Sequence, residues 1–362
     1  MFMVSQFSKQ ESLNSKKGWH KMNKIVTFGE MMMRLKPTDK KRMLQADQFD
    51  ANYGGSEANV AVSLSLFGDQ AAFVSKFPKN ILGQAATDKL REYGVDTSLL
   101  QYGGPRLGIY FFEKGASVRS TKVTYDRAGS SFALSKSEEY DWPTLLKGAD
   151  YFYFSGITAA LSDEMRKTIL KACQYCQEHG IKVACDLNFR GKLWTPEEAQ
   201  SYMKKIMPYL TVCLVNDEDF EQSLGIYAFD GDMSRGIEQK DTFINGMKEI
   251  VKQYPNIKVV ASVLRNIQSV DKSTWMALML KDDKIYESPA YNIDVLEGVA
   301  GGDAFGAGLM HGILNGTDPQ ETIDYAIAAS VLKLTVLGDL NVSTKEDVEA
   351  VMQGGAGTRV AR

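Results

Sequence analysis

Residues 297–305 read Glu297-Gly298-Val299-Ala300-Gly301-Gly302-Asp303-Ala304-Phe305. This stretch places one carboxylate, Asp303, beside a turn of small residues that leads into an apolar helix. A helix N-terminus with little side-chain bulk offers unpaired backbone N–H groups to an anion, and the helix dipole adds roughly half a positive charge there. The combination is typical of phosphoryl transfer, with Asp303 placed to accept a proton from an attacking hydroxyl. An ordinary glycine-rich connection between a strand and a helix fits this segment equally well, so the rest of the chain has to decide.

The 362 residues are 44% hydrophobic and carry a net charge of -3. A chain of this length can bury a large core, and its length alone permits about two domains. The small net charge gives no broad basic surface, which argues against nucleic acid and anionic membrane as main partners. No apolar run approaches the ~20 residues needed to cross a bilayer, and the N-terminus lacks the apolar core of a secretory signal. The sequence therefore predicts a soluble cytoplasmic protein.

The four cysteines are Cys173, Cys176, Cys185 and Cys213, and only the first two are closely spaced. With no second pair and no nearby histidine pair, they are expected to be buried, reduced thiols rather than a metal or redox site. The polar residues 1–22 are expected to form a disordered extension, and residues 353–362 a flexible tail.

Helix and strand signals alternate through most of the chain, which favours one large α/β unit at residues 23–352. Strands are expected at 24–28, 72–77, 151–155, 182–186, 211–215 and 257–263, with a strand pair around 274–287. Helices are expected at 54–67, 82–93, 163–179, 197–207, 217–224, 241–253, 303–315, 319–336 and 344–352. Such alternation implies right-handed crossovers and a mostly parallel sheet. Two extended regions, 31–53 and 104–130, are expected to meet as a small β lid.

Three loops that follow predicted strands are rich in polar groups, at 186–190, 216–219 and 297–303. Ligands of doubly wound sheets bind at the carboxyl ends of the strands, so these loops are expected to form the site. The chain has no Gly-x-x-x-x-Gly-Lys-Ser/Thr loop, which excludes a Walker-type NTPase, and no GxGxxG after a strand, which weakens a dehydrogenase interpretation. Its three histidines form no constellation suited to acyl transfer.

In this order, the loops resemble the ribokinase-like (PfkB) family of carbohydrate kinases, over nearly the whole of residues 23–350. The segment Tyr53-Gly54-Gly55-Ser56-Glu57-Ala58-Asn59-Val60-Ala61 is similar to the first signature of that family, and Gly301-Gly302-Asp303-Ala304-Phe305 is similar to the second. Two signatures ~250 residues apart, with βα alternation between them, are a specific match. The resemblance implies an α/β fold of the three-layer sandwich type, with a mostly parallel central sheet and a small β lid.

Within the family, the likeness is strongest to the kinases of 2-keto-3-deoxygluconate. It rests on the segments Gly108-Ile109-Tyr110-Phe111, Tyr125-Asp126-Arg127, Asp186 to Arg190, Val263-Leu264-Arg265 and Gly338-Asp339. The resemblance implies that the sugar acid is contacted by Gly54, Gly55, Tyr110, Tyr125, Arg127, Arg190 and Asp339. Two arginines suit this substrate because a guanidinium can hold a carboxylate through paired hydrogen bonds. Surface ion pairing is the alternative for each arginine, and ordinary strand packing is the alternative for each tyrosine.

The resemblance further implies ATP-dependent phosphorylation of the hydroxyl at carbon 6, with Asp303 as general base. The backbone N–H groups of Ala300, Gly301 and Gly302 would form an anion hole for the phosphoryl group. Asn216 and Asp219 resemble the Asn-x-x-Glu element of the family, which organises magnesium-bound water, with Asp in place of Glu. Arg265 is expected near the nucleotide phosphates. An acidic helix start for Asp219 and a structural role for Arg265 stay open.

The second signature departs from the family pattern Asp-x-x-Gly-Ala/Gly-Gly-Asp, because Ala300 replaces a glycine. If that position has positive φ, alanine costs about 1 kcal/mol or more. Two other functions therefore stay open: a kinase for a neutral sugar such as fructose or ribose, and a weakly active or non-catalytic sugar-acid or nucleotide-binding protein. The exposed strand edges of a β lid, together with the family likeness, predict a homodimer through the lid.

Overall fold

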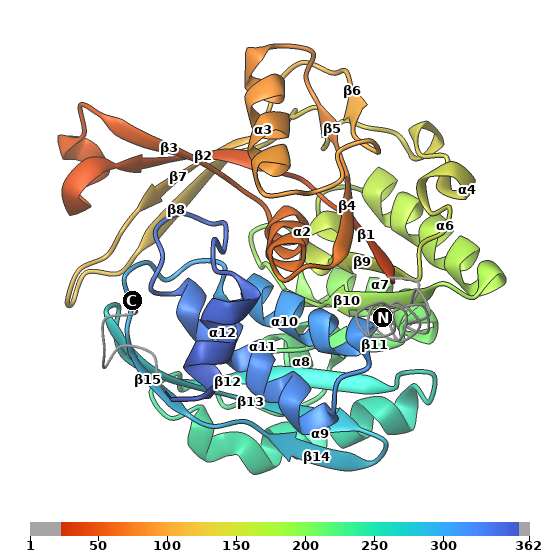
Figure 1. The fold of residues 1–362 in the computed structure, drawn as a ribbon, viewed down its shortest axis with the longest axis vertical. Helices are drawn as coiled ribbons and strands as arrows, with labels where there is room; N and C mark the ends of the chain where they lie inside the picture. Colours follow the sequence, from red (N-terminus) through yellow and green to blue (C-terminus); the bar gives the residue numbers. More distant parts are fainter. Residues whose placement is uncertain (1–22, 355–362) are drawn as a thin grey trace, which may run out of the picture.

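A nine-stranded sheet forms the centre of the computed structural model, which describes residues 23–354 (Figure 1). Its strands, in spatial order, are β14 (Lys284–Glu287), β13 (Lys272–Lys281), β12 (Val259–Ser269), β11 (Val212–Leu214), β10 (Lys182–Asp186), β9 (Tyr151–Ser155), β1 (Lys24–Phe28) and β4 (Gln70–Val74), with β15 (Tyr291–Asp294) also paired to β13. Neighbours from β12 to β4 run parallel, whereas β13 pairs antiparallel with β12, β14 and β15. The prediction of a mostly parallel sheet is confirmed.

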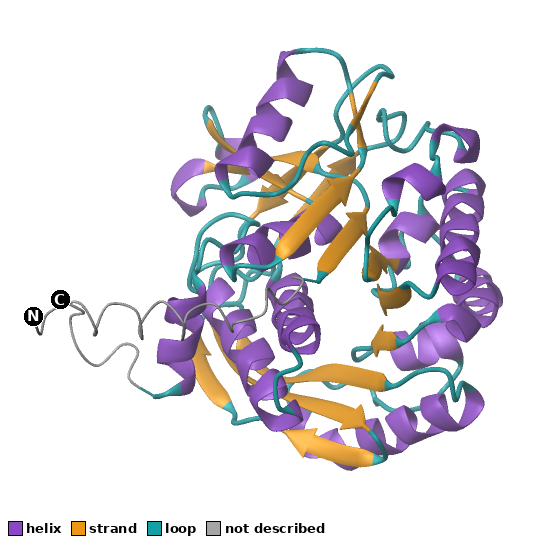
Figure 2. Ribbon diagram, turned by 45° about the vertical axis from the view of Figure 1, so that its right-hand side comes forward, coloured by secondary structure: helices purple, strands orange, loops and turns teal. Residues whose placement is uncertain are grey.

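Helices cover both faces of this sheet, which gives three layers (Figure 2). One face carries α2 (Ser56–Leu66), α3 (Ile81–Glu92), α10 (Gly301–Asn315), α11 (Pro319–Lys333) and α12 (Lys345–Met352). The other carries α4 (Trp142–Leu145), α5 (Gly156–Ala160), α6 (Asp163–His179), α7 (Pro196–Ile206), α8 (Asp219–Leu224) and α9 (Lys240–Gln253). Successive strand residues point to opposite faces, so Val183 and Cys185 enter one apolar core while Ala184 enters the other.

The helix boundaries follow local capping chemistry. Helix α6 begins after Ser162, whose side chain accepts a hydrogen bond from the N–H of Met165, and ends at His179, where Gly180 caps it in the left-handed conformation. Helix α7 begins with a capping box between Thr195 and Glu198. These signals lie within a few residues of each helix end, which is why the predicted ranges agree closely with the observed ones.

The two extended regions pair with each other in a second, four-stranded sheet, here called the small sheet. Its order is β3 (Phe49–Gly54), β2 (Met32–Pro37), β7 (Ile109–Glu113) and β8 (Lys122–Asp126). Figure 1 shows this sheet extending from one side of the molecule, beside the ends of the central strands. Strands β3 and β8 are its two edges.

Two predicted elements are wrong in detail. The strand expected at 72–77 is broken at Ser75, since β1 ends opposite Val74 and the carbonyl of Ser75 accepts a bond from Gln101 instead. Residues Lys76–Phe77 (β5) then pair with Gln101–Tyr102 (β6) in a separate two-stranded sheet.

The helix expected at 319–336 ends at Lys333, because the carbonyl of Leu334 accepts hydrogen bonds from the N–H groups of Leu296 and Glu297. Strand β15 and the short helices α4 and α5 were not predicted.

All four cysteines are buried and free, as expected. Across residues 23–354, none of the helices combines the length and the apolar character that a membrane span requires. The predictions for residues 1–22, and for the tail beyond Gly354, lie outside the described residues.

Candidate active site

A cavity of about 570 Å³ lies between the small sheet and the carboxyl ends of the central strands. This volume is in the range of pockets that hold small-molecule ligands. The predicted site residues that line it are Gly54, Gly55, Tyr110, Tyr125, Arg127, Arg190, Asn216, Asp219, Arg265, Ala300, Gly302, Asp303 and Asp339. Gly301 does not line the cavity, and a Cβ added to it would lie 3.2 Å from both Leu334 and Trp275. The fold thus brings residues from both ends of the sequence into one cavity.

Asp303 lies in the first turn of α10, and both of its oxygens accept hydrogen bonds from α2. Oδ1 accepts from Ser56 Oγ at 2.7 Å, and Oδ2 accepts from Asn59 Nδ2 at 2.7 Å. Burial raises the pKa of Asp303, and the hydrogen bonds from Asn59 and Ser56 act against that rise without cancelling it. Neutral donors hold the carboxylate while leaving it a stronger proton acceptor than an exposed aspartate.

The turn before α10 places Ala300 in a backbone conformation that is costly for alanine. Ala300 is the N-cap residue, with φ 58° and ψ 15° in the left-handed region, and no side chain among residues 23–354 caps the helix. A Cβ added at Gly302 would meet open space. Ala300 and Gly302 line the cavity, so the start of α10 borders it with little side-chain bulk, as an anion site requires.

Two of the three arginines in the cavity wall pair with carboxylates. Arg127 donates from Nε to Glu30 Oε2 at 2.8 Å and also from Nη2, while its guanidinium lies over the ring of Tyr125. Arg265 pairs with Asp217 and lies over the ring of Trp275. The alternative of ion pairing thus holds for Arg127, although its partner Glu30 is buried rather than on the surface.

Arg190 differs from the other two arginines. Its Nη1 donates to the carbonyl of Phe189 at 2.8 Å, and no carboxylate among residues 23–354 lies within ion-pair distance of it. An arginine in a cavity wall without a paired carboxylate is available to an anionic ligand.

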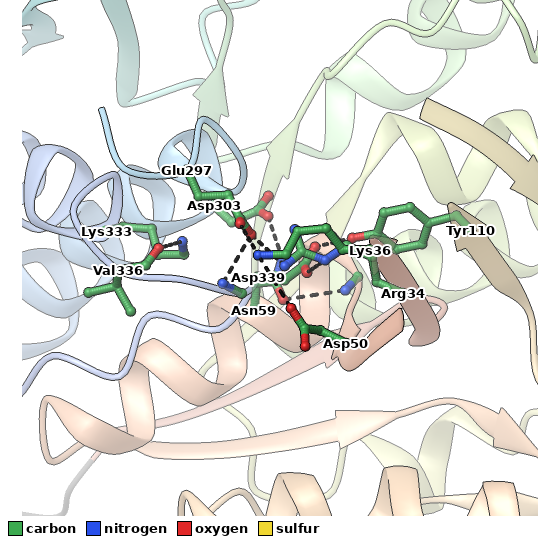
Figure 3. Close-up of polar contacts among 12 residues, drawn as sticks. Arg34, Lys36, Asp50, Asn59, Tyr110, Glu297, Asp303, Lys333, Val336 and Asp339 are labelled. Carbon is green, nitrogen blue, oxygen red and sulfur yellow. Dashed lines mark hydrogen bonds and ion pairs between the residues drawn. The ribbon is translucent and has the colours of Figure 1, made fainter. Parts of the chain in front are cut away.

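Asp339 belongs to a buried charge network that sequence reasoning missed (Figure 3). Tyr110 donates its hydroxyl to Asp339 Oδ1, and Arg34 Nε lies 3.0 Å from Asp339 Oδ2. Arg34 also donates to Glu297, to which Lys36 Nζ donates at 2.9 Å. Burial would raise the pKa of Glu297, but Arg34 and Lys36 outweigh it and hold that pKa below its ordinary value.

The two glycines of the first signature allow close approaches of backbone segments. A Cβ on Gly54 would lie 2.4 Å from the Cβ of Asp339, and one on Gly55 would lie 1.9 Å from the carbonyl oxygen of Glu30. Any side chain at either position would displace a neighbouring segment of the cavity wall.

Asp219 and Asn216 already make hydrogen bonds that order their loop. Asp219 accepts from the N–H groups of Phe189 at 2.6 Å and Asn216 at 2.9 Å, and Asn216 Oδ1 accepts from Val263 N–H at 2.9 Å. Burial raises the pKa of Asp219 to about 6. These bonds support the alternative in which Asp219 has a structural role at the start of its helix, because the Asp219 carboxylate fixes the turn before α8.

The cavity nevertheless contains oxygen donors suited to magnesium. Asp186 Oδ1 is buried without a hydrogen-bond partner and belongs to the cavity wall, as do Asp217 and Glu218. No cluster of three or more His, Cys, Asp or Glu within residues 23–354 forms a metal cage. Magnesium typically keeps several waters and binds through one or two carboxylates and substrate phosphates, so these residues fit it.

Lys333, like Arg34, is a buried charged group that the sequence analysis did not predict. A lone lysine in the apolar helix α11 is a pattern that could have indicated it. Its ammonium is fully buried and donates to the carbonyl of Val336 at 3.2 Å. Burial lowers the pKa of Lys333 to about 8, although Asp339 and Glu297 act in the opposite direction. For Arg34, the signal is a charged residue between apolar neighbours in a strand.

Comparison with known proteins supports the kinase interpretation of this cavity. A family model described as pfkB family carbohydrate kinase matches residues 22–346. The chain is 32% identical over 331 residues to a 2-dehydro-3-deoxygalactonokinase of Haloferax volcanii, covering 91% of this chain and 97% of that protein.

Solved structures agree with this match. The crystal structure of 2-dehydro-3-deoxygluconokinase from Thermotoga maritima superposes with a TM-score of 0.87 at 42% identity, covering 92% of this chain and 100% of that one. A putative 2-keto-3-deoxygluconate kinase from Enterococcus faecalis gives a TM-score of 0.83 at 25% identity, covering 94% and 99%. With the ribokinase-like architecture and both signature segments at one cavity, these matches show that the chain belongs to the PfkB family of carbohydrate kinases.

Proposed function

We propose that this kinase transfers the γ-phosphoryl group of ATP to the terminal hydroxyl, at carbon 6, of 2-keto-3-deoxygluconate or its galactonate epimer. Relatives named for kinases of each epimer cover more than nine-tenths of the chain. The observation that carries the proposal is that Asp303 and Arg190 line the same cavity as the open N-terminal turn of α10.

Asp303 is the general base in this reaction. Its carboxylate takes the proton of the sugar hydroxyl as the hydroxyl oxygen forms a bond to the γ-phosphorus. The bond from that phosphorus to the bridging oxygen breaks, and its electron pair leaves with ADP. Phosphoryl transfer needs in-line placement and charge stabilisation more than covalent help, so one base and a set of N–H donors suffice.

Backbone N–H groups at Ala300, Gly301 and Gly302 donate to the transferring phosphoryl oxygens at the positive end of the α10 dipole. Arg265 leaves Asp217 for the nucleotide phosphates. Magnesium, when bound with ATP, neutralises phosphate charge, and Asp186, Glu218 and water held at Asn216 would hold it.

The substrate carboxylate is the ligand that suits Arg190, with Arg127, Tyr125 and Tyr110 completing the sugar site. A neutral sugar would offer the Arg190 guanidinium no anionic partner, whereas a sugar acid gains a charge-assisted hydrogen bond there. Gly54, Gly55 and Asp339 line the same cavity, and Asp339 accepts a hydrogen bond from Tyr110. We also propose that the small sheet acts as a lid, that its exposed edges pair in a homodimer, and that the enzyme works in the cytoplasm.

The test measures ADP release with 2-keto-3-deoxygluconate, its galactonate epimer, fructose, ribose and adenosine, for the wild type and Asp303→Asn. We expect turnover of one or both sugar acids, and a loss of kcat of about 1,000-fold or more in Asp303→Asn with binding of ATP and sugar acid retained.

Arg190→Gln is the matched test of the carboxylate contact. It should raise KM for the sugar acid by about 10-fold or more, since a charge-assisted hydrogen bond contributes about 1.5–3 kcal/mol. Turnover of fructose or ribose alone would contradict the carboxylate argument. Binding of ATP and sugar acid without turnover by the wild type would instead show a non-catalytic relative.

A further inference from the structure

Three cations hold the segment that precedes α10. Two are in strand β2 of the small sheet, and the third directly follows strand β7. Lys114 Nζ donates to the carbonyl of Leu296, Arg34 Nη2 donates to Glu297 Oε1, and Lys36 Nζ donates to Glu297 Oε2 at 2.9 Å. Figure 3 shows Arg34 and Lys36 converging on this carboxylate. Glu297 lies three residues before Ala300 and is fully buried. The small sheet therefore contacts the turn before α10 through charged groups as well as through apolar packing.

The same network reaches the predicted sugar contacts. The guanidinium of Arg34 lies over the ring of Phe112, and its Nε forms an ion pair with Asp339 Oδ2. The other oxygen of Asp339 accepts a hydrogen bond from the hydroxyl of Tyr110. The N–H of Gly338 donates to Glu297 Oε1 at 3.1 Å. One guanidinium and one carboxylate thus join the small sheet, the turn before α10 and the loop that carries Asp339.

This arrangement is poorly explained as a source of stability. Burying a guanidinium and two carboxylates costs several kcal/mol per ion, and apolar residues of equal volume often give a protein that is as stable or more so. The ion pairs instead provide a fixed geometry. Both oxygens of Glu297 accept hydrogen bonds from cations, and Arg34 pairs with both Glu297 and Asp339. The turn they hold includes Ala300, whose left-handed backbone costs about 1 kcal/mol and needs an external restraint.

We propose that Glu297, held by Arg34 and Lys36, is a positioning residue for phosphoryl transfer that sets the turn before α10 from the small sheet. The carboxylate touches neither substrate, and it acts by fixing the backbone whose N–H groups receive the phosphoryl oxygens. Arg34 also pairs with Asp339, whereas Lys36 contacts Glu297 and not Asp339, so a change at Lys36 reaches the turn before α10 without removing the ion pair at Asp339. The proposal rests on the proposed role of the α10 N-terminus.

Lys36 gives the sharpest test, because its side chain is 12% exposed and lies at the rim of the network. Lys36→Met keeps most of the apolar stem and removes the charge, whereas Lys36→Arg keeps the charge. We expect Lys36→Met to lower kcat by about 10- to 100-fold, as for a misplacement of about 1 Å at the reacting groups, with KM for the sugar acid unchanged within about twofold. Lys36→Arg should restore most of kcat, and Glu297→Gln should lose at least as much as Lys36→Met.

The matched control is Lys41→Met, which removes an exposed pair with Asp47 in the connection between β2 and β3. It should change neither kcat nor KM. Thermal unfolding of every variant, followed with and without the sugar acid, reports folding independently of turnover.

Two outcomes would overturn the proposal. One is a fall in the melting temperature of Lys36→Met and Glu297→Gln with kcat of the folded enzyme unchanged. The other is a rise in KM for the sugar acid alone. Asp303→Asn, measured in parallel, distinguishes a failure of the positioning proposal from a failure of the proposed function. If Asp303→Asn turns over normally, the assigned base is wrong, whereas a dead Asp303→Asn with a fully active Lys36→Met contradicts only the positioning role.

Discussion

Asn59 Nδ2 donates to Asp303 Oδ2 at 2.7 Å across a separation of 244 residues. This contact joins the first signature segment to the second, and the hydroxyl of Ser56 adds a parallel bond to the other oxygen. The first signature is therefore more than a sugar-facing glycine pair. Its helix supplies the two donors that orient the proposed base.

Loss of these donors should shift the pH dependence of the reaction. Both hydrogen bonds favour the ionised form of Asp303, so Ser56→Ala and Asn59→Leu should each raise its pKa further. The acid limb of the kcat/KM profile would then move to higher pH, by about one unit for a bond of about 1.5 kcal/mol. Ser65→Ala, further along α2 and outside the cavity, should leave the limb in place. An unmoved limb in both variants, with Asp303→Asn inactive, would mean that another group controls the profile.

Ala300→Gly should relieve strain at the start of α10. Glycine adopts φ near 58° without the Cβ clash that costs alanine about 1–2 kcal/mol, but its freer unfolded chain offsets about 0.4–1 kcal/mol of the gain. We expect a free energy of unfolding that is equal or up to about 1 kcal/mol higher, and undiminished kcat. Ala304→Gly, one turn later at a helical and buried position, should instead destabilise by about 1 kcal/mol or more. Denaturant unfolding measures both, and a clear loss of stability in Ala300→Gly would show that no strain is stored there.

Glu57 should make the protein less stable as the pH rises from about 4.5 to 7. Its Oε1 accepts bonds from Ser155 N–H at 2.9 Å and Thr158 Oγ at 2.6 Å, yet burial raises the pKa of Glu57 to about 7. The folded state then holds more protons than the unfolded state in this window, so the free energy of unfolding falls with pH, by on the order of 3 kcal/mol for this group. Unfolding curves for Glu57→Gln should show a flatter dependence, whereas exposed Glu178→Gln should match the wild type. Equal slopes in all three proteins would remove Glu57 as the cause.

Arg265→Leu should weaken the binding of ATP without weakening the binding of the sugar acid. The guanidinium lies over Trp275 and pairs with Asp217, at the part of the cavity lined by the loop after β11. Loss of a charge-assisted bond to phosphate should raise KM for ATP by about 10- to 100-fold, with KM for the sugar acid nearly constant. Arg235→Leu removes an arginine whose partners are the exposed residues Asp230 and Asp232, and it serves as the control. A parallel rise in both KM values would place Arg265 in a purely structural role.

The sequence predicted the elements better than the contacts between them. Signals such as the Thr195 capping box act over a few residues, so they set helix ends without help from the rest of the fold. The break at Ser75 depends on where a partner strand ends, which the segment itself does not encode.

The same distinction holds for the site. Asp303, Arg190 and the glycine pairs belong to motifs that are continuous in the sequence. The contact between Arg34 and Glu297 joins residues 263 positions apart, and the sequence around either residue does not identify the other as its partner. Only the tertiary fold shows that both are fully buried and face each other.

The strand order has a consequence for how the molecule is made. From β9 to β14, each new strand lies beside the one synthesised before it, so this half of the sheet can grow by simple addition as the polypeptide emerges. Helix α10 breaks that pattern, since it must return to pack on α2, which is among the earliest helices made. Closing so long a loop is entropically unfavourable and slow. A nascent kinase should therefore acquire most of its sheet well before it can bind or phosphorylate anything.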